Sequence, residues 1–116
     1  MNTAQISKKS VTIDELNTAV ELISQAANED FLRKVDGQVE DNEISLIVIP
    51  QTKYSKLVYD DAQNYNPVFG FIVMNDSREF KKGDLLRAIN ANEPDLTESV
   101  GNIYDLENAD ISWTGL

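Results

Sequence analysis

The sequence predicts an α+β domain: an N-terminal helix packed on a small, mostly antiparallel sheet, then a short second helix and an irregular acidic C-terminal segment. Three observations lead to this prediction. Apolar residues recur with helical spacing near the N-terminus. Two apolar runs in the middle are rich in β-branched and aromatic residues, which favours strands. The last apolar residues stand singly among acids, without a period.

Length and composition predict one domain that spans residues 1–116. We expect residues 1–11 to form a flexible or extended arm, because the helical pattern begins only after them. No apolar run follows Lys8 and Lys9, so a signal peptide is not expected. No apolar run approaches the roughly 20 residues that span a bilayer, and we therefore expect a cytoplasmic protein.

The first helix is expected from residue 13 to about residue 36. Thr12 and Glu15 have the spacing of a capping box, in which each side chain binds the other residue's backbone N–H. Gly37 offers a C-terminal stop, and Asn28–Asp30 leaves open whether the helix is continuous or bent. The apolar stripe that should face the core comprises Ile13, Leu16, Val20, Ile23, Ala27, Phe31 and Val35.

Ile44–Ile49 is dense in β-branched residues and predicts a central, largely buried strand. Tyr54–Tyr59 is compatible with a second strand or with a short helix. Val68–Met74 predicts a further strand, in which Gly70 indicates a bulge or a close backbone approach. The aromatic residues on either side of Gly70 are expected to share one buried face of this strand.

Leu85–Ala91 is expected to form the short second helix, with Asp84 at or near its N-terminal cap. Leu85, Leu86 and Ile89 would then face the core. The remainder, Asp95–Leu116, has no strong periodicity and is expected to be irregular.

The absence of cysteine and histidine excludes several kinds of chemistry. Disulfides, thiolate nucleophiles, Cys/His zinc sites and histidine-based triads all require one of these residues. The five glycines do not cluster into a phosphate-binding loop. Carboxylate pairs could do glycosidase-like work, but with 20 acidic residues a close pair indicates little. We therefore expect a protein that is not an enzyme, with no catalytic residue, cofactor or metal ion.

The charge distribution is the strongest functional signal. Against ten basic residues, the 20 acids give a net charge of −10, and no Lys or Arg follows Arg87. Acids two positions apart in an extended chain lie roughly 6.5–7 Å from each other, so rows of them can approximate phosphates. The candidate partner-binding residues are Glu40, Asp41, Glu43, Asp60, Asp61, Glu93, Asp95, Glu98, Asp105, Glu107 and Asp110.

A small, cysteine-free, acidic α+β chain with carboxylates along its loops resembles the DNA-mimic proteins of bacteria and phages. The resemblance implies an inhibitor or regulator that binds a basic DNA-binding protein, such as a histone-like nucleoid protein or a nuclease. We expect no direct contact to nucleic acid or membrane, and a monomer is favoured although the sequence leaves the oligomeric state open. Two alternatives stay open: an immunity-type protein that caps a toxin, with Tyr65 or Trp113 carrying the affinity, and a structural or assembly subunit.

Overall fold

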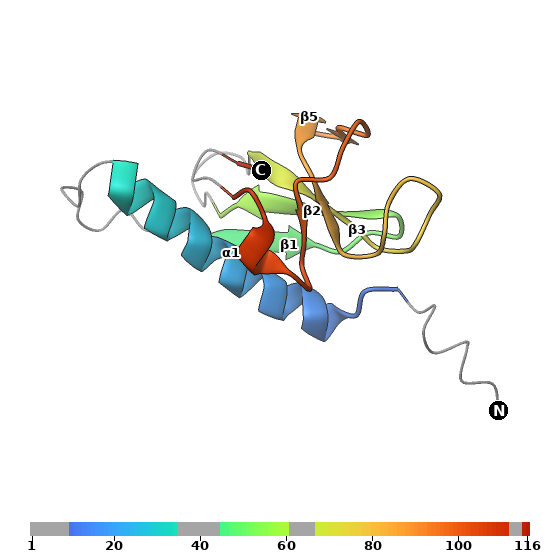
Figure 1. Cartoon of the computed structure of the whole chain (residues 1–116), viewed down its shortest axis with the longest axis horizontal. Coiled ribbons are helices and arrows are strands. Elements are labelled where there is room, and N and C mark those ends of the chain that lie inside the picture. Colours follow the sequence, from blue (N-terminus) through green and yellow to red (C-terminus); the bar gives the residue numbers. More distant parts are fainter. Residues whose placement is uncertain (1–9, 35–44, 61–66, 112–114) are drawn as a thin grey trace.

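The computed structural model describes residues 10–34, 45–60, 67–111 and 115–116, and within them one long helix packs on a five-stranded antiparallel sheet (Figure 1). The expected α+β class is confirmed. The sheet has the strand order β1-β2-β3-β4-β7, so β1 and β7 are its two edges. Its strands are β1 (Leu46–Ile49), β2 (Tyr54–Tyr59), β3 (Val68–Val73), β4 (Asp84–Leu86) and β7 (Gly101–Asn102). The hairpin of β5 (Ala88–Asn90) and β6 (Glu93–Pro94) and the 3-10 turn η2 (Leu106–Asn108) complete the described elements.

Helix α1 spans Ile13–Lys34 and begins at the expected capping box. The Glu15 N–H donates to Thr12 Oγ1 at 3.1 Å, and the Thr12 N–H donates to Glu15 Oε1 at 2.9 Å. The helix continues through Asn28 without a break, so the one-helix alternative is confirmed. Val35 and the proposed stop at Gly37 lie outside the described residues.

The core-facing line of α1 runs through Leu16, Ala19, Ile23 and Ala27, which are all buried. Val20 and Phe31 are half-buried on the flank of this line. The expectation that Ile13 faces the core is wrong, because its side chain is 54% exposed. Ile13 has the same angular position as Phe31 on the helix, and the true line of burial passes through the small residue Ala19.

Strand β1 confirms the expected strand but contradicts its expected position and burial. The segment lies at an edge of the sheet and not in its centre. Its residues Leu46 and Val48 contribute to the core beneath α1, whereas Ile47 and Ile49 are 37% and 38% exposed. A run of β-branched residues favours a strand, but burial on both faces also requires covering layers that the run itself does not reveal.

Strand β2 shows that Tyr54–Tyr59 is a strand and not a helix. In its pairing with β3, Leu57 is opposite Gly70 and Val58 is opposite Val68, so Phe69 is the extra residue of a bulge. A Cβ atom on Gly70 would lie 2.9 Å from the Leu86 carbonyl oxygen, so the backbone approach is close as well. Both expectations for Gly70 are confirmed.

The bulge corrects the expectation that Phe69 and Phe71 share one face. Both are buried, but Phe69 packs in the cluster beneath α1, whereas Phe71 packs with Val73, Phe80 and Leu86 in a second cluster. An extra residue shifts the two-residue alternation of a strand and sends the next side chain to the other face. The sheet is therefore buried on both sides over β3 and β4.

The expected helix over Leu85–Ala91 is wrong: this segment contributes to β4 and β5. Leu85 and Leu86 are both fully buried, but in the two different clusters, as alternation in a strand requires. The expectation that Ile89 faces the core is wrong, because its side chain in β5 is 66% exposed. Asp84 does not cap a helix; its Oδ2 accepts a bond from the preceding Lys81 N–H at 2.9 Å. A seven-residue helix has a high nucleation cost, and pairing with β3 outweighs its local propensity.

The chain on either side of these elements is anchored by backbone hydrogen bonds. The Val11 N–H donates to the Met74 carbonyl at 3.0 Å, which fixes the last part of the expected arm, while residues 1–9 lie outside the described part. The segment from Asp95 is largely irregular, as expected, apart from β7 and η2. No helix among the described residues is long and apolar enough to cross a membrane.

Candidate partner-binding surface

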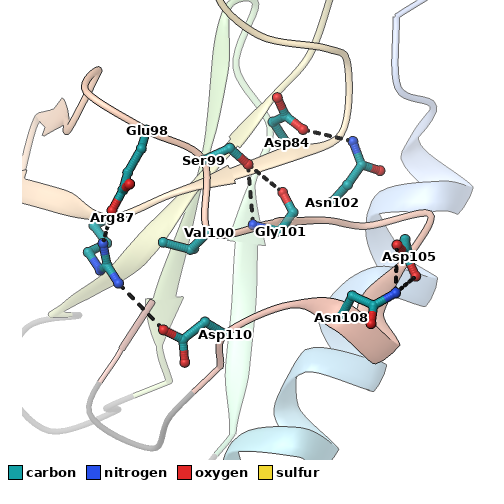
Figure 2. Close-up of a pocket in the computed structure, with 10 residues that line it drawn as sticks. All are labelled: Asp84, Arg87, Glu98, Ser99, Val100, Gly101, Asn102, Asp105, Asn108 and Asp110. Atoms are coloured by element: carbon teal, nitrogen blue, oxygen red, sulfur yellow. Dashed lines mark hydrogen bonds and ion pairs between the residues drawn. The ribbon is translucent and has the colours of Figure 1, made fainter.

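Carboxylates gather around an open depression of about 490 Å³ beside β4 and β7 (Figure 2). Asp84 comes from β4, Glu98 from the loop after β6, and Asp105 and Asp110 from either side of η2. Arg87 lies among them, at the residue between β4 and β5. We call this surface the acidic depression.

Arg87 bridges two of these acids, as Figure 2 shows. Its Nη1 lies 3.1 Å from Glu98 Oε2, and its Nη2 lies 3.5 Å from Asp110 Oδ2. The three side chains are 40%, 67% and 77% exposed, in the order Arg87, Glu98, Asp110. Exposed pairs of this kind contribute only about 0–1 kcal/mol each. A cation from a partner could therefore replace Arg87 at small cost.

Three of the predicted acids, Asp95, Asp105 and Glu93, accept local hydrogen bonds. Asp95 Oδ1 accepts from the Thr97 hydroxyl at 2.7 Å and from its N–H at 2.9 Å, and these bonds hold the pKa of Asp95 below its ordinary value. Both carboxylate oxygens of Asp105 accept from the Asn108 amide at 3.0 Å. The Glu93 carboxylate accepts from the Asn90 amide at 2.8 Å. These carboxylates are held in fixed directions before any partner arrives.

The structure brings part of the predicted residue set together. Glu98, Asp105 and Asp110 line the depression, and Asp95 is tied to its arginine because the Asp95 N–H donates to the Arg87 carbonyl at 2.7 Å. Asp60 directly follows β2, and its N–H donates to the carbonyl of Ser45, just before the edge strand β1. The exposed residues Glu93 and Glu107 belong to β6 and η2, and four predicted residues lie outside the described part: Glu40, Asp41, Glu43 and Asp61.

Two residues of the depression were missed by sequence reasoning. Asp84 was assigned to a helix cap, although its Oδ1 accepts from the Asn102 amide at 3.0 Å and joins β4 to β7. Arg87 was taken only as the boundary of the acidic stretch. A lone arginine directly before a long acidic stretch is a signal for internal pairing, and that pattern could have indicated its role.

A second concave surface of about 280 Å³ lies between α1 and the C-terminal segment, and we call it the helix groove. Leu22 and Tyr104 line it and are 46% and 50% exposed. The Tyr104 hydroxyl donates to Glu15 Oε1 at 3.0 Å. Burial, together with this bond, raises the pKa of Tyr104 to about 12, while the hydrogen bond from the Thr12 backbone lowers the pKa of Glu15.

Among the described residues, no group of three or more Asp or Glu side chains could hold a metal ion. Comparison with known proteins finds no matching family model, no matching curated protein and no matching solved structure. The two concave surfaces are therefore the features of the described residues that bear on function.

Proposed function

We propose that this protein is a non-enzymatic inhibitor or regulator that presents an acidic, DNA-like surface to a basic DNA-binding protein, either a nucleoid protein or a nuclease. The observation that carries the proposal is the acidic depression, which is lined by Asp84, Glu98, Asp105 and Asp110 and in which Arg87 pairs with Glu98 and Asp110. In this proposal the protein is a cytoplasmic monomer that does not itself bind nucleic acid, because its net charge of −10 repels phosphates.

Binding would proceed by exchange of cations. A partner's lysine or arginine that normally grips a phosphate would displace Arg87 from Glu98 and Asp110, whose ion pairs are exposed and weak. Carboxylates such as Asp95 and Asp105 are already oriented, so less conformational freedom is lost when the complex forms. The negative field would also steer the encounter and raise the association rate.

The experiment is displacement of a labelled DNA duplex from a purified histone-like protein and from a basic nuclease, followed by fluorescence anisotropy. The double variant Glu98→Gln/Asp110→Asn should weaken competition, whereas Arg87→Gln should strengthen it, because it removes the cation that partners these acids. Competition should fall steeply as salt rises, since exposed charges are screened beyond about 8–10 Å at physiological salt.

The matched control is Glu21→Gln/Glu29→Gln, which neutralises the same number of exposed acids on α1, away from the depression. This control should compete like the parent protein. If the control loses as much affinity as Glu98→Gln/Asp110→Asn, binding depends on overall charge and not on this surface. If Arg87→Gln weakens competition, the cation-exchange mechanism is wrong.

The helix groove favours a second candidate function, an immunity-type protein that caps a toxin. Its exposed Leu22 and Tyr104 could be buried by a partner, and such contacts are insensitive to salt. A complex that survives high salt and the neutralising variants, but is lost in Tyr104→Ala, would support this function over the first. Tyr65 and Trp113, the aromatic residues expected to carry such affinity, lie outside the described residues.

A further inference from the structure

The outer edge of β1 carries unpaired backbone groups. The Tyr59 N–H donates to the Pro67 carbonyl on the β3 side, and the Asp60 N–H donates to the Ser45 carbonyl. In an antiparallel ladder, hydrogen-bonded and non-hydrogen-bonded pairs alternate. Leu46, which is opposite Tyr59, therefore directs its N–H and C=O away from β2, and so does Val48. Within the described part of the chain these groups have no hydrogen-bond partner.

The side chains of this edge do not protect it. Natural edge strands usually carry a charge, a proline or a bulge that discourages pairing, and Leu46–Ile49 has none of these. On the face opposite α1, Ile47 and Ile49 are more than one third exposed. Lys56 is paired opposite Ile49, and the Lys53 ammonium lies 5.5 Å from the Tyr54 ring centroid. Neither lysine forms an ion pair with a described residue.

The position of α1 discriminates between occupants of the edge. The helix packs over β1, on the side where Leu46 and Val48 join the core (Figure 1). A second copy paired antiparallel through the same edge would bring its own helix to that side. The two strands would be about 4.8 Å apart, whereas a helix with its side chains is about 10–12 Å wide. A single extended segment without an overlying helix fits this space.

We propose that the β1 edge is a docking site for an extended segment of another protein, which adds to the sheet as a strand antiparallel to β1. The backbone of that segment would bind the N–H and C=O groups of Leu46 and Val48. Its apolar side chains would cover Ile47 and Ile49, and acidic side chains at its N-terminal end would pair with Lys53 and Lys56 at the turn end of β1. This site is independent of the acidic depression, which lies at the opposite side of the sheet.

The probe is a fluorescein-labelled octapeptide of two N-terminal glutamates followed by six residues of alternating valine and threonine. Its charge-reversed control has two lysines in place of the glutamates. We expect the glutamate peptide to bind at least about 10-fold more tightly than the lysine peptide, because like charges near Lys53 and Lys56 are repelled. By NMR hydrogen exchange, the Leu46 and Val48 amides should exchange fast in the free protein. At saturating peptide they should exchange at least about 10-fold more slowly.

Val48→Pro removes one outward N–H but no bond of the β1–β2 ladder, as proline on an edge strand permits. Val48→Ala is its matched control, because it also loses the side chain but keeps the N–H. Peptide binding should disappear in the first variant and stay within about 3-fold of the parent protein in the second. Ile47→Ser removes an exposed apolar side chain without adding charge and should weaken binding of either valine peptide. This variant serves as the test if Val48→Pro does not fold.

Four outcomes would overturn the proposal. The glutamate peptide could fail to bind at millimolar concentration, or it could bind Val48→Pro and Val48→Ala equally. The Leu46 and Val48 amides could already be protected in the free monomer, which would mean that the edge is occupied within the chain. Sedimentation could show a dimer that Val48→Pro dissociates, which would assign the edge to a second copy.

Discussion

Ile23→Ala tests the register of α1 against the sheet. The Ile23 side chain is fully buried, and the substitution removes three of its carbon atoms. At about 0.8 kcal/mol per buried methylene the transfer loss is about 2.4 kcal/mol, and the cavity left behind adds to it. We expect the free energy of unfolding to fall by about 3–4 kcal/mol, and the melting temperature by about 10–15 °C for a domain of this size. Circular dichroism checks both values: urea unfolding gives the free energies of unfolding of the variant and the parent protein, and thermal unfolding gives their melting temperatures.

Leu22→Ala is the matched control, because Leu22 is the neighbouring residue and is 46% exposed. Because about half of the Leu22 side chain is already in water, Leu22→Ala loses only about half of the transfer free energy of a buried leucine and leaves no closed cavity. Alanine also favours the helix by a few tenths of a kcal/mol. We expect a loss of about 1 kcal/mol or less, without a change in the urea dependence of the free energy. A loss below about 1 kcal/mol for Ile23→Ala, or equal losses for the two variants, would refute the register.

Four further predictions concern single residues. Thr12→Ala should cost about 0.5–2 kcal/mol of unfolding free energy by loss of the cap. The pKa of Glu15 is held below its ordinary 4.5, so its contribution to the free energy of unfolding is present above pH 4.5 and is lost as pH falls through the lowered pKa. In urea unfolding at a series of acidic pH values, Glu15→Gln should therefore lose less stability than the parent protein. Gly83 has φ +89°, so Gly83→Ala should cost about 1–2 kcal/mol in thermal unfolding. The pKa of Tyr104 is raised from 10.0 to about 12, so its contribution to the free energy of unfolding is complete below pH 10 and is lost as pH rises toward 12. In urea unfolding over the same pH range, Tyr104→Phe should therefore lose less stability than the parent protein.

Local patterns predicted the elements whose evidence is contained in a few neighbouring residues. The capping box at Thr12 and the helix after it need only an adjacent side chain and a 3.6-residue period. Gly70 marked its bulge because a missing side chain is itself a local signal. The errors at Ile44–Ile49 and Leu85–Ala91 share one cause: strand order and the covering layers decide which faces are buried. Those contacts are distant in sequence.

The sequence predicts which segment supplies the acids of the candidate surface, but not how these acids are arranged in space. The acid-rich stretch after Arg87 correctly indicated the segment that supplies Glu98, Asp105 and Asp110 to the depression. The sequence could not show that a turn at η2 brings these residues back toward β4. It also could not show that Arg87 lies between two of them, since ion pairs across a loop have no fixed spacing.

The two proposed surfaces differ in charge. Acids collect beside β4 and β7, whereas Lys53 and Lys56 flank the apolar edge at β1. A basic partner would be attracted to the carboxylates of the depression and repelled by these two lysines. The β1 edge would then remain free, because it lies on the other side of the sheet. If both proposals hold, the protein joins a basic partner to an extended acidic segment, and saturation of one site leaves the peptide affinity of the other unchanged.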